Sequence, residues 1–130
     1  MRDPRPGVVW SKGRVARRAA YSTWMGSARW RARRAAWRAC WVAEHRREPV
    51  CAVCGCHWTL HCGDLHHRSY DRLGRELDAD LTPLCRGCHD QVHVILESSA
   101  AWRRMNRAQA TDLIVAHLRN RKSRHDHPHP

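Results

Sequence analysis

Two Cys-x2-Cys pairs constrain this chain more than any other feature of its sequence. The first pair is Cys51 and Cys54, followed by Gly55, and the second pair is Cys85 and Cys88, about thirty residues later. A Cys-x2-Cys turn lets two thiolates point at one ion, and two such turns complete a tetrahedral zinc site. We therefore predict one structural Zn²⁺ ion bound by these four cysteines.

The remaining cysteines leave alternatives open. A redox-active Cys-x2-Cys usually occurs once, near a βαβ pattern that this chain lacks. Cys56 and Cys62 are rival ligands for the same ion, although neither forms a further Cys-x2-Cys pair. Cys40 neighbours Trp41 on an expected helix, and we expect it to be a small buried apolar side chain.

Length and charge limit the size of the fold and the kind of partner. The chain has 130 residues, enough for one small domain with extensions, and its net charge of +12 favours a polyanion as partner, nucleic acid first.

The apolar residues give no sign of a membrane protein. No apolar run approaches the ~18 residues of a membrane span, and the first residues lack a secretory signal. We therefore expect no membrane contact and a cytoplasmic location, where cysteines favour metal over disulfides. Without Phe and with two Tyr, a large apolar core is not expected, so metal would add stability.

The charge is distributed unevenly along the chain. Residues 1–48 carry 13 Lys and Arg against 3 Asp and Glu, residues 49–98 carry 4 against 7, and residues 99–130 carry 7 against 2. We predict a metal-bearing core at 49–98 that follows a basic, Arg/Trp-rich helical arm. A C-terminal helix at 99–119 and a disordered tail at 120–130 complete the chain.

The basic arm has the composition of a helix with one aromatic face. Trp30, Trp37 and Trp41 are spaced i, i+7 and i+11, which places them within a ~40° sector of a helix. Gly26-Ser27 is a plausible break, and Pro49 ends the helix. We expect the tryptophans to pack on the metal centre and some of the surrounding arginines to contact nucleic acid. The alternative is that the arginine face is only solvated.

The histidines of the core predict a second metal site. His89 and His93 are spaced i and i+4 on an expected helix, so that their rings lie on one face and can chelate one cation. Cys88 lies ~100° away around the same helix and faces a different site. One helix can therefore hold two metals on two sides.

The adjacent pair His66-His67 adds two different chemical groups. Neighbouring side chains of an extended segment point to opposite faces, so one ring can bind metal while the other faces substrate. Phosphodiester hydrolysis needs both functions, because a cation stabilises the leaving oxygen and a neutral histidine accepts a proton from water. The alternative is that these histidines complete zinc sites or fill hydrogen-bonding roles.

Together these residues resemble the HNH endonuclease family, in the zinc-stapled four-cysteine branch typical of phages and bacteria. The matching residues are Cys51, Cys54-Gly55, Leu65-His66-His67, Tyr70, Arg72-Leu73-Gly74, Glu76, Asp80-Leu81, Leu84-Cys85, Cys88-His89 and His93. The resemblance covers about residues 50–95. It implies an α+β fold class, with a small ββα-metal core, a structural four-cysteine zinc and flanking basic helices.

The resemblance also implies roles for single residues. His66, His67, Asp80 and His89 form the catalytic set, in which His67 is the general base that activates water. His66, His89 and His93 match the ligands of a divalent cation, for which three imidazoles favour Mn²⁺, Ni²⁺ or Zn²⁺ over Mg²⁺. Asp80 stands where many members have an Asn that braces the loop behind the base. Three residues of the loop signature are assigned either to loop bracing or to phosphate contact: Tyr70, Arg72 and Glu76.

The expected function is metal-dependent hydrolysis of DNA, with a 5′-phosphate and a 3′-hydroxyl as products. We expect the basic arms to bind DNA by releasing counterions, with weak sequence preference because no helix-turn-helix or finger array is recognisable. One rival is a non-catalytic zinc-finger module that binds nucleic acid. Another is an accessory nuclease directed by a phage packaging protein.

Overall fold

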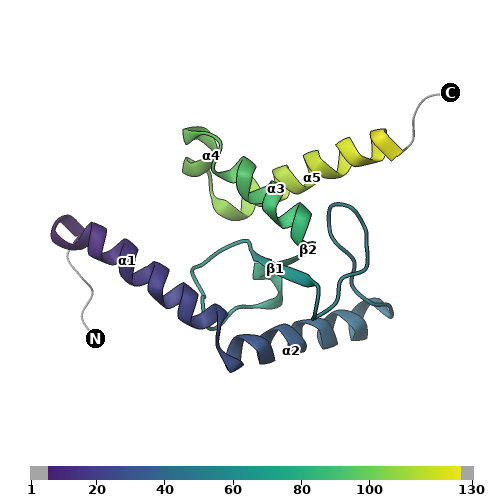
Figure 1. Ribbon diagram of the computed structural model, residues 1–130, viewed down its shortest axis with the longest axis horizontal. Helices are drawn as coiled ribbons and strands as arrows, with labels where there is room; N and C mark the ends of the chain where they lie inside the picture. Colours follow the sequence, from purple (N-terminus) through teal and green to yellow (C-terminus); the bar gives the residue numbers. More distant parts are fainter. Residues whose placement is uncertain (1–5, 127–130) are drawn as a thin grey trace.

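The computed structural model describes residues 6–126, with side chains described for residues 16–124. It is a mixed α and β structure, as predicted, with one two-stranded antiparallel sheet among helices (Figure 1). The elements in chain order are α1 (Pro6–Met25), α2 (Ala28–His45), β1 (Gly63–His67), the 3₁₀ turn η1 (Asp78–Asp80), β2 (Leu81–Cys85), α3 (Arg86–Leu96), α4 (Ala100–Arg104) and α5 (Arg107–Asp126).

The N-terminal arm is two helices separated at the predicted break. Ser27 caps α2, because its hydroxyl oxygen accepts a hydrogen bond from the Trp30 amide at 3.0 Å. The helix ends at His45, four residues before Pro49, where Arg46 adopts a left-handed conformation (φ 59°). With these ends, α2 lies along the sheet. Its three tryptophans on one face, Trp30, Trp37 and Trp41, are called the tryptophan stripe below.

The β1–β2 hairpin has a register that sorts its side chains onto two faces. Gly63 pairs with Cys85 at one end and His67 pairs with Leu81 at the other. Because side chains alternate along a strand, His66 and His67 point to opposite faces, as predicted.

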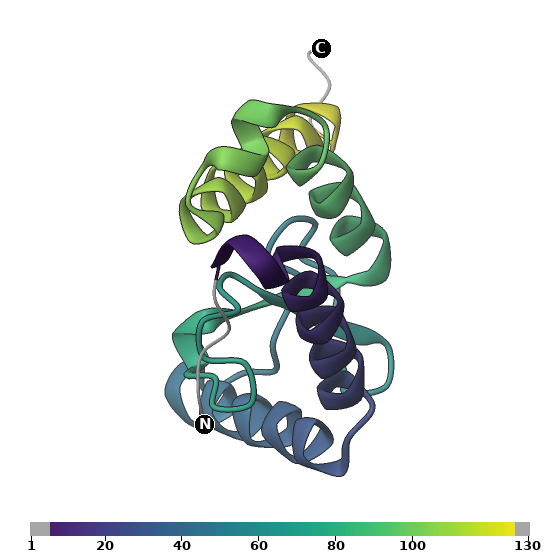
Figure 2. The same ribbon diagram turned by 90° about the vertical axis from the view of Figure 1, so that its left-hand side faces the viewer.

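Helices cover both faces of the hairpin. In Figures 1 and 2 the hairpin lies between α2 on one side and the α3–α5 helices on the other. The α2 side is packed with tryptophan and leucine: Trp30, Trp37, Trp58, Leu65 and Leu81. The α3 side holds a second apolar cluster that includes two of the four paired cysteines: Cys51, Val53, Leu84, Cys88, Val92, Leu96, Ala110, Ile114, Val115 and Leu118. Trp30 and Trp37 are buried, but they lie on the α2 side of the hairpin, across from the apolar cluster that contains Cys51 and Cys88, so they pack on the hairpin and not directly on the cysteines as expected.

A close contact fixes where β1 begins. The indole nitrogen of Trp58 donates a hydrogen bond to the carbonyl oxygen of Asp64 at 2.7 Å. A Cβ atom at Gly63 would lie 2.3 Å from that nitrogen, so only glycine fits under the ring. β1 therefore starts beneath Trp58. Because side chains alternate along a strand, this starting point also decides which β1 residues face α2 and which face α3.

The C-terminal region differs from the sequence-based prediction in two ways. The single helix expected at 99–119 is divided into α4 and α5, which are separated at Met105–Asn106. Residues 120–126, expected to be disordered, continue α5, so this prediction was wrong for them. They include Arg121, Lys122 and Arg124, whose charges favour the C-terminal end of a helix. Residues 127–130 lie outside the described residues.

Across residues 6–126, none of the helices combines the length and the apolar character needed to cross a bilayer.

Candidate functional site

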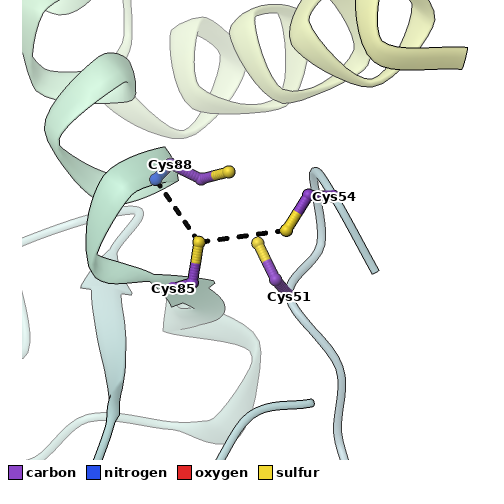
Figure 3. A group of neighbouring side chains, drawn as sticks. All are labelled: Cys51, Cys54, Cys85 and Cys88. Atoms are coloured by element: carbon purple, nitrogen blue, oxygen red, sulfur yellow. Dashed lines mark hydrogen bonds between the residues drawn. The ribbon is translucent and has the colours of Figure 1, made fainter. Parts of the chain in front are cut away.

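The four predicted cysteine ligands lie around one point. The sulfur atoms of Cys51, Cys54, Cys85 and Cys88 are all within 4.8 Å of one another (Figure 3). The Cys54 and Cys85 sulfurs are 3.9 Å apart. Two thiolates bound to one tetrahedral zinc ion at ~2.3 Å lie about 3.8 Å apart, so the cluster has the size of a zinc site.

Backbone hydrogen bonds shape this cysteine cluster. Gly55 has a positive φ of 77° and donates its amide to the carbonyl of Cys51 at 2.9 Å, which closes the first turn. The Cys88 amide donates to the Cys85 sulfur at 3.5 Å, at the start of α3. The Ala52 amide donates to a β2 carbonyl at 2.8 Å, so the turn is attached to the hairpin.

The other cysteines are not members of the four-thiol group found among the described residues. Cys56 and Cys62, the rival ligands, are both exposed. Cys56 nevertheless lies beside the group, because contacts with Cys54 and Cys85 raise the pKa of its thiol. Cys40 is also exposed, so the expectation that it is buried was wrong; it lies on the outward side of α2, beside the tryptophan stripe. Burial raises the pKa of the Cys88 thiol, so a metal binding here would displace a proton.

Three histidines form a second cluster, on the α3 side of the hairpin. His66 comes from β1, and His89 and His93 come from α3; one ring nitrogen of each lies within 4.8 Å of the other two. The Nε2 atoms of His89 and His93 are 3.0 Å apart. Two imidazole nitrogens bound to one ion at ~2.0–2.1 Å lie about 3.0–3.4 Å apart, so the pair is spaced as ligands of a common cation.

His66 offers a buried ring nitrogen to this cluster. Its side chain is 0% exposed, and its Nε2 lies 3.0 Å from the hydroxyl of Thr111 on α5. Its Nδ1 is buried and has no hydrogen-bond partner among the described residues. Burial, with smaller effects from Arg107 and the other histidines, lowers the pKa of His66 to about 2. The ring is therefore neutral, and Nδ1 is left as the ligand atom.

His89 is held by a carboxylate, and His93 lies against His89 inside the cluster. His89 Nδ1 lies 3.0 Å from a carboxylate oxygen of Asp64, which fixes the proton on Nδ1 and leaves Nε2 to face the cluster. Burial and the neighbouring His89 lower the pKa of His93. Neutral imidazoles are the form that binds metal.

His67 lies on the opposite face of β1, and its surroundings differ from the expectation that it faces substrate. Its ring is 2% exposed, stacked on Trp30 at 5.1 Å between centroids and edge-on to Tyr21 at 6.0 Å. Tyr70 lies 5.4 Å away on the loop. The expectation of an open ring was wrong for this structure, because the last turns of α1 and the start of α2 cover that face.

Glu76 is the hydrogen-bonding partner of His67. One of its oxygens lies 2.7 Å from His67 Nε2 and also accepts a hydrogen bond from the Trp24 indole at 2.8 Å. The other oxygen is buried without a partner among the described residues. Burial lowers the pKa of His67, although the bond to Glu76 opposes this shift. Of the two roles left open for Glu76, its contacts favour bracing.

Asp80 and Arg72 brace the loop between the strands. Arg72 donates to both carboxylate oxygens of Asp80, and the Leu77 amide donates to one of them at 2.9 Å. These hydrogen bonds lower the pKa of the buried Asp80 carboxyl. The Asp80 carbonyl also accepts from the Arg68 amide at 2.7 Å, next to His67. These contacts hold Asp80 behind the loop that follows the histidine pair.

Sequence reasoning missed three residues around these histidines. Asp64 lies two residues before His66, on the same face of the strand, and that spacing was a usable signal. Thr111 and Arg107 come from α5, about forty residues further along the chain, and no local pattern marks them. Comparisons of this chain with protein-family models, with curated proteins and with solved structures gave no match.

Proposed function

We propose that this chain is a metal-dependent endonuclease of the HNH type, which hydrolyses phosphodiester bonds of DNA. The observation that carries the proposal is the three-histidine cluster beside a separate four-thiol cluster. A structural zinc site alone does not need three further imidazoles, and the buried Nδ1 of His66 has no other use in the described structure. The net charge of +12 fits a polyanionic substrate.

The donor sets suit two ions of different character. Four thiolates favour a structural Zn²⁺, and His66, His89 and His93 would hold a divalent cation such as Mn²⁺, Ni²⁺ or Zn²⁺. When bound, that cation would supply Lewis-acid stabilisation of the phosphate and of the departing 3′ oxygen. Thr111 and Asp64 keep two of the ligand rings oriented through their other nitrogens.

His67 is the proposed general base. If its Nε2 carries a proton donated to Glu76, the lone pair is on Nδ1, which can accept a proton from an attacking water. The lowered pKa keeps the ring neutral at pH 7, and the Glu76 carboxylate stabilises the imidazolium that forms. The water oxygen bonds to phosphorus as the bond from phosphorus to the 3′ oxygen breaks. The 3′ oxygen then takes a proton from solvent, so the products carry a 5′-phosphate and a 3′-hydroxyl, and the imidazolium of His67 returns its proton to solvent.

The buried state of His67 requires a movement before water can reach it. Tyr21, in the last turns of α1, lies edge-on to the ring. The helix is joined to α2 by a two-residue connection, Gly26 and Ser27. We propose that this end of α1 shifts when the substrate binds.

A second candidate is a non-catalytic zinc-containing module that binds nucleic acid. The observation that favours it is the 2% exposure of His67, because a ring packed among aromatic side chains can serve structure alone. This candidate predicts one zinc ion per chain and no cleavage. The nuclease needs a second, more exchangeable ion.

The test is nicking of supercoiled plasmid with added Mn²⁺, Ni²⁺ or Mg²⁺, with and without chelator. The parent is compared with His67→Gln and with His117→Gln, a substitution at an exposed position of α5. We expect His67→Gln to lose about 10²–10⁴-fold in rate, as is typical for a lost general base, and His117→Gln to match the parent. Equal rates for His67→Gln and the parent would remove the base assignment, and no nicking by the parent with any ion would favour the binding module.

A further inference from the structure

Several arginines near the hairpin are already paired with carboxylates. An arginine whose charge is neutralised by a neighbouring carboxylate attracts a phosphate less than one without such a partner. Five arginines lie within ion-pair distance of a carboxylate among the described residues. Four of them also donate hydrogen bonds to it: Arg33 to Asp78, Arg38 to Glu48, Arg68 to Asp112, and Arg72 to Asp80. The fifth, Arg86, lies 3.9 Å from Asp64 without a hydrogen bond. Charge alone therefore does not identify the arginines that are available to a nucleic acid.

Arg34 is held in place but has no carboxylate within ion-pair distance among the described residues. From α2, it donates a hydrogen bond to the carbonyl oxygen of Gly63 at 2.6 Å, and its guanidinium lies over the Trp58 ring at 5.5 Å. Burial lowers the pKa of Arg34, the nearby Asp64 carboxylate opposes this shift, and the charge of Arg86 adds a smaller lowering effect. The guanidinium is thus fixed at the start of β1, beside a second positive charge.

Arg86 lies at the same end of the hairpin. It directly follows Cys85, and Cys85 is the strand partner of Gly63, to which Arg34 is bonded. Its side chain is 71% exposed, and its nearest carboxylate oxygen, on Asp64, is 3.9 Å away. The other oxygen of Asp64 is bonded to His89 of the three-histidine cluster. Two guanidiniums therefore share one carboxylate that already holds a histidine, which leaves excess positive charge next to the cluster.

Arg107 lies on the other side of the cluster. From the start of α5, it donates to the carbonyl oxygen of His67 at 2.8 Å and to the Tyr70 hydroxyl at 2.9 Å. It is close enough to His66 and His93 to lower the pKa of both rings. No carboxylate lies within ion-pair distance of it in the described part of the chain, so its charge also remains available.

We propose that Arg34, Arg86 and Arg107 bind backbone phosphates of one DNA strand on the two sides of the three-histidine cluster. Guanidinium groups present a planar fork of donors that matches phosphate oxygens, and here two of the three groups are held in place by the hydrogen bonds that they donate to backbone carbonyl oxygens. The strand runs from the Arg34–Arg86 end of the hairpin, across the cluster, to Arg107. This inference rests on the proposed function for the choice of DNA, but binding does not require cleavage.

The experiment measures binding of the zinc-containing full chain to a short fluorescent DNA duplex over a range of salt concentrations, without a nicking cofactor. The variants are Arg34→Gln, Arg86→Gln and Arg107→Gln. The matched controls are Arg38→Gln, one helical turn from Arg34 on α2 but paired with Glu48, and Arg68→Gln, which is paired with Asp112. Thermal unfolding of each variant shows that the fold is kept, and Arg34→Lys keeps the charge at that position.

Each of the three site variants is expected to lower the slope of log K against log salt by about 1, with the triple variant near 3. The controls should leave the slope nearly unchanged, and Arg34→Lys should retain the parent slope. Unchanged slopes in the site variants, or equal losses in the controls, would overturn the inference. Lowered slopes in a protein that never nicks DNA would support this DNA-binding surface and reject the nuclease. Nicking by the parent, together with unchanged slopes in the site variants, would support the nuclease and reject this surface.

Discussion

The two faces of the β1–β2 hairpin give two adjacent histidines different surroundings. Toward α3, His66 lies beside His89 and His93, and one of its buried nitrogens is left without a hydrogen bond. Toward α1 and α2, His67 is packed against aromatic rings and its Nε2 is bonded to Glu76. Both rings are buried, and both have one nitrogen held from behind.

The difference shows how neighbours in a strand acquire different chemistry without a difference in residue type. The α3 side offers three nitrogens to one point, which suits an ion. On the α2 side, His67 is bonded to one carboxylate and belongs to no three-ligand group among the described residues, which suits transfer of a proton. A buried polar group is stable only when a partner satisfies it, so the partners on each face determine the role of each ring.

The largest effect is expected from the four-thiol cluster on the α3 side. Structural zinc contributes on the order of 10 kcal/mol to the folding of small domains, which is comparable with the whole stability of such a domain. Cys88→Ser should therefore lose bound zinc and the cooperative unfolding transition followed by tryptophan fluorescence. Cys40→Ser, at an exposed position, is the control and should unfold like the parent. A Cys88→Ser variant that keeps its zinc and unfolds at the parent temperature would contradict the assignment.

The second-largest effect is expected on the α2 side, where His67 is proposed to accept a proton. Glu76→Gln is expected to reduce nicking about 10–100-fold, as is typical for loss of a residue that orients an imidazole. Because the bond to Glu76 raises the pKa of His67, its loss should move the acid limb of the pH–rate profile to lower pH. Glu44→Gln, at an exposed position on α2, is the control. An acid limb that stays in place would show that His67 is not the titrating group.

The third effect concerns the α3 side, where the pH dependence of the free energy of unfolding shows whether the fold keeps His66 neutral. In the folded chain the pKa of His66 is about 2, whereas in the unfolded chain it is about 6.5. The unfolded chain therefore binds a proton below about pH 6.5 that the folded chain does not, and the free energy of unfolding falls as the pH falls. The expected loss between pH 7.5 and 5.5 is about 1.4 kcal/mol for this residue.

Urea unfolding at both pH values measures that loss, and His66→Gln should remove about this amount from the difference. Burial also lowers the pKa values of His67 and His93, so part of the acid sensitivity should remain in the variant. Identical differences in parent and variant would mean that His66 is not kept neutral by the fold.

The smallest effect is expected from the cover on the α2 side. Tyr21→Ala removes a ring that lies 6.0 Å from His67. His67 should then react a few-fold faster with a histidine-modifying reagent, as followed by mass spectrometry of the peptides. Tyr21→Phe keeps the ring and should react like the parent. If Tyr21→Ala does not change the reactivity, α1 is not what protects His67.

The sequence was sufficient to predict which cysteines and histidines form the two clusters, but not which residues support those side chains. The spacings of Cys51, Cys54, Cys85 and Cys88 and of His89 and His93 predicted both clusters, because local geometry fixes which side chains share a face. Thr111 was invisible, because it meets His66 only through the packing of α5 against the rest of the fold. The burial of His67 was missed for a similar reason, since helices more than twenty residues away in sequence cover it.

The remaining differences also have tertiary causes. The sequence left Glu76 between two roles, and only the distance to His67 distinguishes them. The length of α5 was misjudged because a polar segment was read as a tail. Its helical continuation to Asp126 requires only that the preceding turns be anchored in the apolar cluster.

The first two turns of α3 serve both clusters at once. Cys85 and Cys88 face the thiol cluster, while His89 and His93 face the imidazole cluster. Adding or deleting one residue between Cys88 and His93 would rotate the later side chains by about 100° relative to the earlier ones, and no side-chain adjustment restores that phase. The length of this segment is therefore constrained by two side-chain clusters rather than one, and mutational insertions should be tolerated far less here than at the C-terminal end of α5.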